Sequence, residues 1–432
     1  MNNAWEVIAN EQSVDPEVEV PKVGQTTLIK RQPIFNDKFT LVGYELDFRN
    51  YSHHPHGEAA IIKTNGNSMV TLFDSLSAVS IDALLGNALA FVACEPEDIV
   101  PDFEDYVSPD RVVIDLALPP DYDKEDYDVL KEQIIALKNR GFQLAINQYA
   151  LEKPFLELLR YTQYLKIDTR SLPEAKLVAL PKKLAVLPNL KMVATHIASP
   201  DQFKLMGAAG YKAFQGPFYA QPITSTARAI ESAQQNILIM IRLVQKQADL
   251  TEIEEKIKRD PALSFNLLRY VNSAAFGAAA EITSYQRALQ ILGYQKLMRW
   301  LSIRLIAASK HPANVLLLRA SLTRGRMMEL LAHEEQCKTN PEQAFLTGLF
   351  SLLDKILGVP MLDALAGIHL PDDVNNALIS RAGPLGVSLK LAEYCELPTT
   401  EQGAYPPSDE KLMQLVADSH LKAMAWAEEA IK

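Results

Sequence analysis

In this chain of 432 residues, few side chains that could take part in catalysis or bind metal lie close together in the sequence. The tightest group is His53, His54 and His56, whose imidazoles could bind a transition metal. No fourth ligand is fixed nearby, so we favour a flexible polar loop over a metal site. The segment 95–128 holds thirteen acidic residues against two basic ones. It predicts a solvated loop and helix face, with a cation-binding edge as the alternative.

The sequence contains no common catalytic signature. Gly-rich nucleotide-binding, nucleophile-elbow and zinc-protease motifs are all missing. Cys94, Cys337 and Cys395 form no CxxC pair, which excludes a zinc ribbon or a disulfide framework and favours a reducing compartment. The chain is 48% apolar and 22% charged, as globular proteins are, and its formal charge is −10. Such a charge makes it a poor clamp for nucleic acid.

Nothing in the sequence predicts export or membrane insertion. The first twenty residues carry five acids and no base, whereas a secretory signal begins with basic residues before an apolar run. The most apolar long window, 345–368, is interrupted by three charged residues, which would be costly in a bilayer. We therefore expect buried helices in this window and a cytoplasmic protein.

Two patterns divide the chain after a loose leader over 1–25. From 26 to 228, β-branched runs alternate with amphipathic windows such as Tyr127–Arg140 and Lys153–Gln163, which predicts a parallel sheet. Eight strand candidates suit a closed (β/α)8 barrel, and the hairpin-length gap between the first two predicts one antiparallel strand. The candidates are Thr27–Ile34, Thr40–Phe48, Leu89–Val92, Val112–Leu116, Gln143–Ile146, Tyr164–Ile167, Lys191–Ala194 and Lys212–Phe214.

From 229 to 432 the apolar residues follow a period of 3.6 with no convincing strand, which predicts an all-α bundle. Asp260 before Pro261 is typical of a helix start, and Thr251 with Glu254 forms a capping-box pattern. The fold class is therefore α/β followed by all-α. The first half carries 22 basic and 30 acidic residues up to position 230, and the second is nearly balanced.

An ordered series of short motifs in the first half resembles the EAL domain, a bacterial barrel that hydrolyses cyclic di-GMP. The motifs are Arg31-Gln32-Pro33-Ile34-Phe35, Gly43-Tyr44-Glu45-Leu46-Asp47-Phe48-Arg49, Lys166-Ile167-Asp168 and Gln215-Gly216. The second half resembles an HDOD domain. Its motifs include Arg259-Asp260-Pro261-Ala262-Leu263, Val271-Asn272-Ser273-Ala274-Ala275 and Thr347-Gly348-Leu349-Phe350. Together they resemble a bacterial EAL–HDOD signalling protein.

The resemblance implies which positions would carry chemistry. EAL domains hold Mg²⁺ or Mn²⁺ with a cluster of carboxylates, and these ions activate a water and offset the phosphate charge. Glu45, Lys166 and Gln215 match the family, and Asp115 stands for a glutamate. The remaining ligand positions are degenerate: Ala93, Asn147, Gln148 and Thr195. Two dications facing two carboxylates would be under-neutralised, so we expect no catalytic residues, no metal and no cofactor.

Residual nucleotide binding would depend on the side chains that remain. These candidates are Glu45, Arg49, Asp115, Lys166 and Gln215. The alternative is that Glu45 and Lys166 only form a buried ion pair at the barrel mouth. In the HDOD half, the metal-binding His-Asp doublet of related hydrolases falls on Ser351-Leu352, which removes a second route to catalysis. Asp354 is expected to be solvated or to cap a helix.

These expectations favour a non-enzymatic signalling protein, a catalytically inactive EAL homologue acting as an interaction scaffold in cyclic di-GMP-related motility or biofilm control. Its partners would be other signalling proteins bound by the HDOD half, with no nucleic acid or membrane. One alternative is a cyclic di-GMP receptor that binds without hydrolysis, and another is an atypical active phosphodiesterase.

Overall fold

The computed structural model describes residues 26–53, 59–62, 81–99, 108–220, 232–273, 282–334, 337–366, 368–396 and 410–431. The chain folds into two compact units, one built mainly from 19–221 with 395–417 and the other mainly from 222–394 with 418–432. The predicted leader 1–25 and the predicted boundary between 228 and 229 lie outside the described residues, as do His54, His56 and the side chain of His53.

The first unit contains a closed barrel of eight strands. Its sheet runs β1-β9-β8-β7-β6-β5-β4-β2-β3, and a further pairing of β1 with β2 closes the ring. β1 is antiparallel to both neighbours, and the other barrel strands are parallel. The strands are β1 Thr26–Phe35, β2 Leu41–His53, β3 Ala59–Ile62, β4 Leu89–Cys94, β5 Val112–Leu116, β6 Gln143–Asn147, β7 Tyr164–Asp168, β8 Lys191–Thr195 and β9 Ala213–Gln215. The predicted fold class is confirmed, and β3, which pairs with the outer part of β2, was not predicted.

A layer of buried side chains fills the barrel interior, because alternate residues of each strand point inward. Its members are Ile34, Phe91, Val113, Ala145, Tyr164, Val193 and Ala213. Gly43 of β2 faces the same layer, since a Cβ there would lie 2.7 Å from the Phe91 ring and 2.6 Å from Leu89 O. The glycine thus leaves room for the aromatic side chain on the neighbouring strand.

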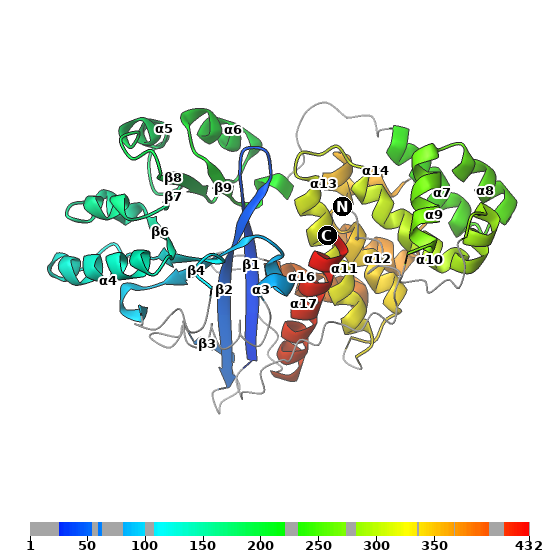
Figure 1. Ribbon diagram of the computed structural model, residues 1–432. Coiled ribbons are helices and arrows are strands. Elements are labelled where there is room, and N and C mark those ends of the chain that lie inside the picture. The colour runs from blue at the N-terminus through cyan, green and yellow to red at the C-terminus, as the bar shows by residue number, and fades with distance from the viewer. Residues whose placement is uncertain are drawn as a thin grey trace. The chain divides into compact units, whose positions relative to one another are not determined.

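Helices cover the outer side of the strands (Figure 1). They are α3 Ile81–Leu85, α4 Tyr127–Asn139, α5 Glu174–Lys183 and α6 Pro200–Ala209. The predicted helix over Lys153–Gln163 is wrong, because the chain forms the 3-10 segment η5 Phe155–Arg160 there. Pro154, which has no N–H to donate, precedes this segment, and the connection is short.

The second unit is helical throughout its described residues. Its helices are α7 Ser232–Gln245, α8 Leu250–Lys258, α9 Pro261–Val271, α10 Tyr285–Ala307, α11 Asn314–Ala332, α12 Pro341–Phe350, α13 Leu353–Leu357, α14 Met361–Leu365, α15 Asp372–Ser380 and most of α16 Gly383–Glu396; α17 Glu410–Ile431 ends the chain. Gly293 breaks the helical backbone inside α10 with a φ of 65°. The apolar window 345–368 forms short helices that are largely buried.

Helix starts in this unit follow side-chain capping. The Asp260 carboxylate accepts a hydrogen bond from Leu263 N at 3.0 Å, as predicted. The predicted cap at Thr251 is wrong, because Asp249 is the N-cap and accepts from Thr251 N at 2.7 Å.

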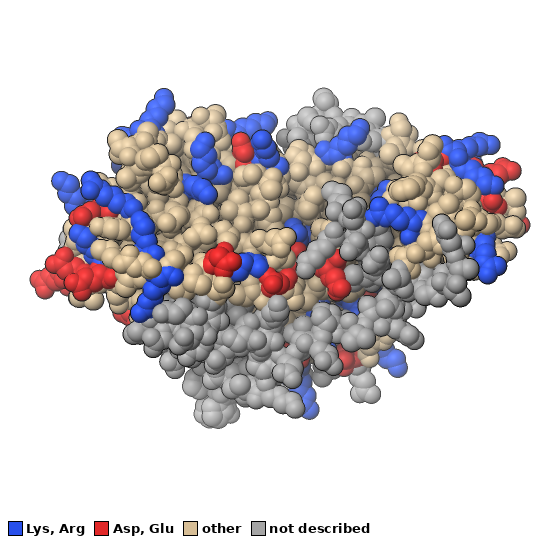
Figure 2. Space-filling model, in the orientation of Figure 1, with Lys and Arg blue, Asp and Glu red and all other residues tan. Residues whose placement is uncertain are grey.

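No helix among the described residues has both the length and the apolar character to cross a bilayer. Basic and acidic side chains are interspersed on the face shown in Figure 2.

Candidate functional site

Seven of the residues that the resemblance singled out lie in one layer at the barrel mouth. Each lies two positions beyond a residue that faces the barrel interior, so the period of two places them on the inner side. We call these side chains the mouth layer: Glu45, Ala93, Asp115, Asn147, Lys166, Thr195 and Gln215. They stand at the carboxyl ends of the parallel strands, where barrel enzymes place their active sites.

Lys166 is the centre of the mouth layer. Its Nζ donates to Glu45 Oε2 at 2.8 Å and to Asp115 Oδ2 at 2.5 Å. Gln215 Nε2 also donates to Glu45 Oε2, at 2.6 Å, and to Gln32 Oε1 on the antiparallel strand. The predicted ion pair between Glu45 and Lys166 is therefore confirmed, and Asp115 joins it. The side chain of Arg49 lies outside the described residues.

Burial and the lysine charge act in opposite directions on the two carboxylates. Burial raises the pKa of Asp115 above its ordinary value, because the nearby Lys166 charge only partly offsets desolvation and the Glu45 charge adds to it. For Glu45, desolvation is outweighed by the Lys166 ammonium and by hydrogen bonds, so its pKa is lowered. Lys166 is itself desolvated, but the two carboxylates raise its pKa, so it stays a cation.

Three of the four positions that were expected to be degenerate carry structural hydrogen bonds. Asn147 Nδ2 donates to Leu118 O at 2.8 Å, and Gln148 Oε1 accepts from Asp168 N at 2.8 Å. Thr195 Oγ1 donates to Ile167 O at 3.3 Å. These three side chains stabilise the loops and strand ends around the mouth.

A two-metal centre does not fit this donor set. In the part of the chain that the structure describes, no three His, Cys, Asp or Glu side chains are grouped closely enough to hold a metal ion. Glu45 and Asp115 both point to Lys166 Nζ, so an ammonium occupies the position between the two remaining carboxylates.

Sequence reasoning missed His196. It follows Thr195 directly at the end of β8, and its Nδ1 lies 3.3 Å from Asp168 Oδ2. Asp168 is two residues beyond Lys166 on β7 and therefore on the same side of the strand. The signal available in the sequence was a histidine immediately after a predicted barrel strand, the usual location of catalytic side chains in this fold.

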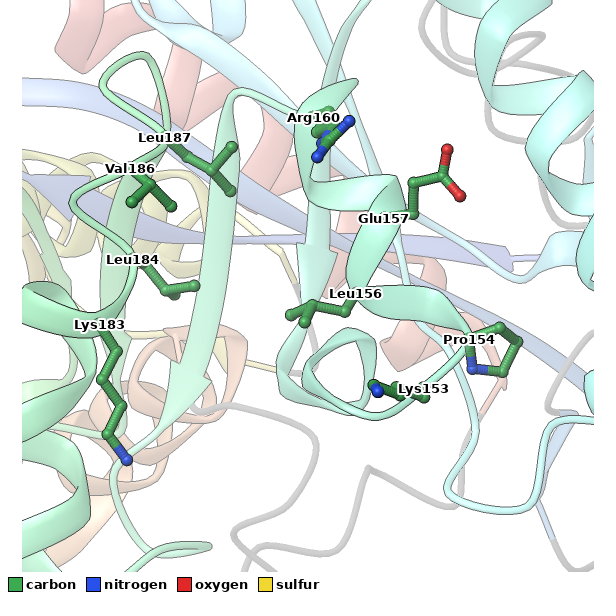
Figure 3. Close-up of a pocket in the computed structure, with 9 residues that line it drawn as sticks. All are labelled: Lys153, Pro154, Leu156, Glu157, Arg160, Lys183, Leu184, Val186 and Leu187. Carbon is green, nitrogen blue, oxygen red and sulfur yellow. The ribbon is translucent and has the colours of Figure 1, made fainter.

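A second hollow on the barrel lies away from the mouth layer. Figure 3 shows this cavity of about 710 Å³ between η5 and the loop after α5, with Leu156 facing Leu184 and Leu187. Glu157 is its only acid, and its carboxylate is bound by Lys131 Nζ and Tyr127 Oη, each at 2.9 Å. Its lining residues include no histidine, cysteine or hydroxyl side chain, so the mouth layer is the better candidate for chemistry.

The helical unit has a guanidinium at the position of the hydrolase doublet. Arg324 Nη1 donates to Ser351 Oγ at 3.1 Å and pairs with Glu393 at 3.4 Å. Asp354 pairs with Lys355 at 2.7 Å, and its side chain is only 17% exposed. Ser351 and Leu352 offer no metal ligands, as expected from the sequence.

Comparisons with known proteins identify the helical unit. Residues 232–365 match the family model of the HDOD domain. The match lies within the helical half of the chain. The chain is 28% identical over 375 residues to the cyclic di-GMP phosphodiesterase CdgJ of Vibrio cholerae, covering 86% of this chain and 85% of that protein. It is 24% identical to the uncharacterized protein YuxH of Bacillus subtilis, covering 85% and 90%. The resemblance to an EAL–HDOD protein is thus confirmed.

Solved structures resemble a part of this chain at low sequence identity. Klebsiella pneumoniae BlrP1, in a calcium and cyclic di-GMP complex, is 17% identical with a TM-score of 0.36, over 45% of this chain and 55% of that one. The PaMucR phosphodiesterase, in a cyclic di-GMP complex, is 16% identical with a TM-score of 0.35, over 44% and 94%.

The relatives correct one prediction. A catalytically inactive homologue was expected from the degenerate ligand positions. A protein that aligns with 86% of this chain is named a cyclic di-GMP phosphodiesterase, and this finding contradicts the prediction that the chain is not an enzyme. The physical reason is that the loss of ligands at four positions does not remove the lysine and the two carboxylates that remain together at the mouth.

Proposed function

We propose that this EAL–HDOD protein is an atypical cyclic di-GMP phosphodiesterase. The observation that carries the proposal is the relationship to CdgJ, which extends over both halves of the chain. The mouth layer supports it, because Lys166 and two acidic side chains lie at the end of the barrel where the family performs its chemistry.

The side chains of the mouth layer suit a phosphodiester. Its non-bridging oxygens carry a negative charge that grows as a water attacks, and a preorganised cation stabilises that charge. Lys166 is held in its charged form and can supply such a cation. Glu45 and Gln215 orient it and each other through Glu45 Oε2. We retain Glu45, Arg49, Asp115, Lys166 and Gln215 as the nucleotide-binding residues of this proposal.

The expectation of no bound Mg²⁺ or Mn²⁺ stays part of the proposal. It is supported by Lys166, whose ammonium takes the place between the two carboxylates. Parallel assays with excess chelator and with added Mn²⁺ measure the metal requirement directly.

The test is hydrolysis of cyclic di-GMP by the purified full chain, with the linear dinucleotide separated by chromatography. We expect turnover by the wild type and a loss of about a hundredfold or more in Lys166→Met, since a preorganised charge contributes that much. Lys204→Met is the matched control, because this lysine side chain is 75% exposed. A wild-type rate no higher than that of Lys166→Met would overturn the proposal.

Further proposals concern the location of the protein, its domain limits and its partner. We propose a cytoplasmic signalling role, domain limits at 26–228 and 229–432, and a protein partner on the HDOD half. The proposal of a protein partner is supported by two exposed apolar side chains, Ile239 and Phe265, which are 44% and 65% exposed. The apolar residues next to Ile239 in α7 are largely buried. Phe265→Ser in the full chain should weaken the partner's binding and leave hydrolysis unchanged.

A further inference from the structure

His196 lies in an uncommon backbone conformation at the end of β8. Its φ is 58°, in the left-handed region that residues other than glycine seldom adopt. Thr169 Oγ1 donates to Thr195 O at 3.0 Å and to His196 O at 3.3 Å, and Ile197 N donates to Gln215 O at 3.0 Å. The turn is therefore held on both sides by neighbouring strand ends. Such conformations persist where the surrounding structure determines them, and they concentrate at functional sites.

The contacts of the His196 ring favour one tautomer. Nδ1 lies 3.3 Å from Asp168 Oδ2 and 3.2 Å from Thr195 Oγ1. The Thr195 hydroxyl can donate to Ile167 O, at 3.3 Å, and accept from Nδ1–H. The negative charge of Asp168 favours the proton on Nδ1, which leaves a lone pair on Nε2. Within the described residues no hydrogen bond reaches Nε2, and the side chain is 32% exposed, so water reaches the ring.

Burial favours the neutral form of the His196 imidazole. Burial lowers the pKa of His196, and the positive charges of Arg170 and Lys166 lower it further. The negative charges of Asp168 and Glu45 raise the pKa, but together they do not outweigh the other effects. Asp168 is desolvated as well, but hydrogen bonds from Arg170 keep its pKa below the ordinary value. The arrangement therefore pairs a neutral histidine with an ionised aspartate, the pattern of an oriented general base.

We propose that His196 Nε2 is the general base that activates the attacking water, with Asp168 and Thr195 as positioning residues. This inference rests on the proposed phosphodiesterase function. A water proton passes to Nε2 as the water oxygen forms a bond to phosphorus and the bond from phosphorus to one ribose oxygen breaks. The leaving ribose oxygen takes a proton from solvent, and the imidazolium returns its proton to solvent. No oxidant or other co-reactant is needed.

The first test compares His196→Asn with the wild type. Asparagine tolerates positive φ and keeps a polar side chain, but it is not a base. We expect kcat to fall about a hundredfold or more, the usual range for losing a general base, while Kd for cyclic di-GMP changes less than about threefold. His196→Gly, which also suits the backbone, should regain part of its kcat when free imidazole is added. Imidazole should not change the rate of Lys166→Met.

Asp168→Asn tests the positioning role. Removing this charge removes the main influence that raises the pKa of His196, so the acidic limb of the kcat/KM profile should move to lower pH. A purely structural role would lower activity without moving the limb. Wild-type turnover together with undiminished turnover by His196→Asn overturns the base assignment and leaves the proposed function intact. If the wild type itself does not cleave cyclic di-GMP, the proposed function fails and the base assignment fails with it.

Discussion

Lys166 Nζ lies 2.5 Å from Asp115 Oδ2, and the two side chains come from strands that are separated by β6. The same Nζ reaches Glu45 on β2, across the mouth of the barrel. The Lys166 ammonium therefore joins β2, β5 and β7. The pKa of Asp115 is raised, whereas the pKa of Glu45 is lowered. Because these groups are largely shielded from water, each depends strongly on the others.

Lys166→Met should destabilise the barrel. The substitution leaves two carboxylates buried without their cation, and removal of one partner from a buried ion pair costs about 3 kcal/mol. Urea unfolding should show this decrease in the free energy of unfolding, with a change below about 0.5 kcal/mol for the exposed control Lys204→Met. Equal stability of the two variants would mean that the ion pair adds nothing to the fold.

Gly43→Ala should destabilise the protein by about 2 kcal/mol, because the new methyl group meets Leu89 O and the Phe91 ring at less than contact distance. Gly207→Ala in α6 is the matched control. Its Cβ would lie 3.7 Å from the nearest atom, and alanine is the better helix former, so a gain of up to about 1 kcal/mol is expected. Thermal unfolding distinguishes the two, and a tolerated Gly43→Ala would contradict the close packing of this layer.

Glu329 should make the helical unit sensitive to acid. It is desolvated, yet its bonds to Arg299, at 2.6 Å, and to Arg326, at 3.0 Å, hold its pKa below the ordinary 4.5. A lowered pKa contributes stability above the unfolded value that is lost as the pH falls through the folded value. The stability difference between wild type and Glu329→Gln should thus be constant above about pH 5 and shrink below pH 4.5. A stability difference that stays constant down to about pH 3 would contradict the lowered pKa of Glu329 as the source of acid sensitivity.

Asp260→Ala should remove about 1 kcal/mol from the free energy of unfolding, the usual effect of losing an N-cap, because Leu263 N then lacks its acceptor. Asp260→Asn should retain most of the stability, since asparagine also caps helices well. Glu255→Ala, at an exposed position in α8, serves as the control and should change stability by less than about 0.5 kcal/mol. Chemical denaturation of the full chain measures all three.

The order of the eight barrel strands was predictable from the sequence, and the resemblance to EAL domains named the residues of the mouth layer. Strands with inward residues at every second position carry Lys166 and Asp115 to the same end of a barrel, and the hairpin-length gap before β2 determines the antiparallel pair. Asp260 before Pro261 marks a helix start by local hydrogen bonding. These features depend on residues close in the chain or on a simple period, so they can be predicted from the sequence.

Only the tertiary structure decided the electrostatics of the mouth layer and the contact of His196 with Asp168. The orientation of Glu45 and Asp115 toward one lysine depends on the closure of the barrel across β2, β5 and β7. The contact between His196 and Asp168 needs the register of β8 against β7 and a positive φ that no sequence period indicates. Distances between side chains on different strands arise from packing, and a short contact of this kind decides which groups are charged and which can accept a proton.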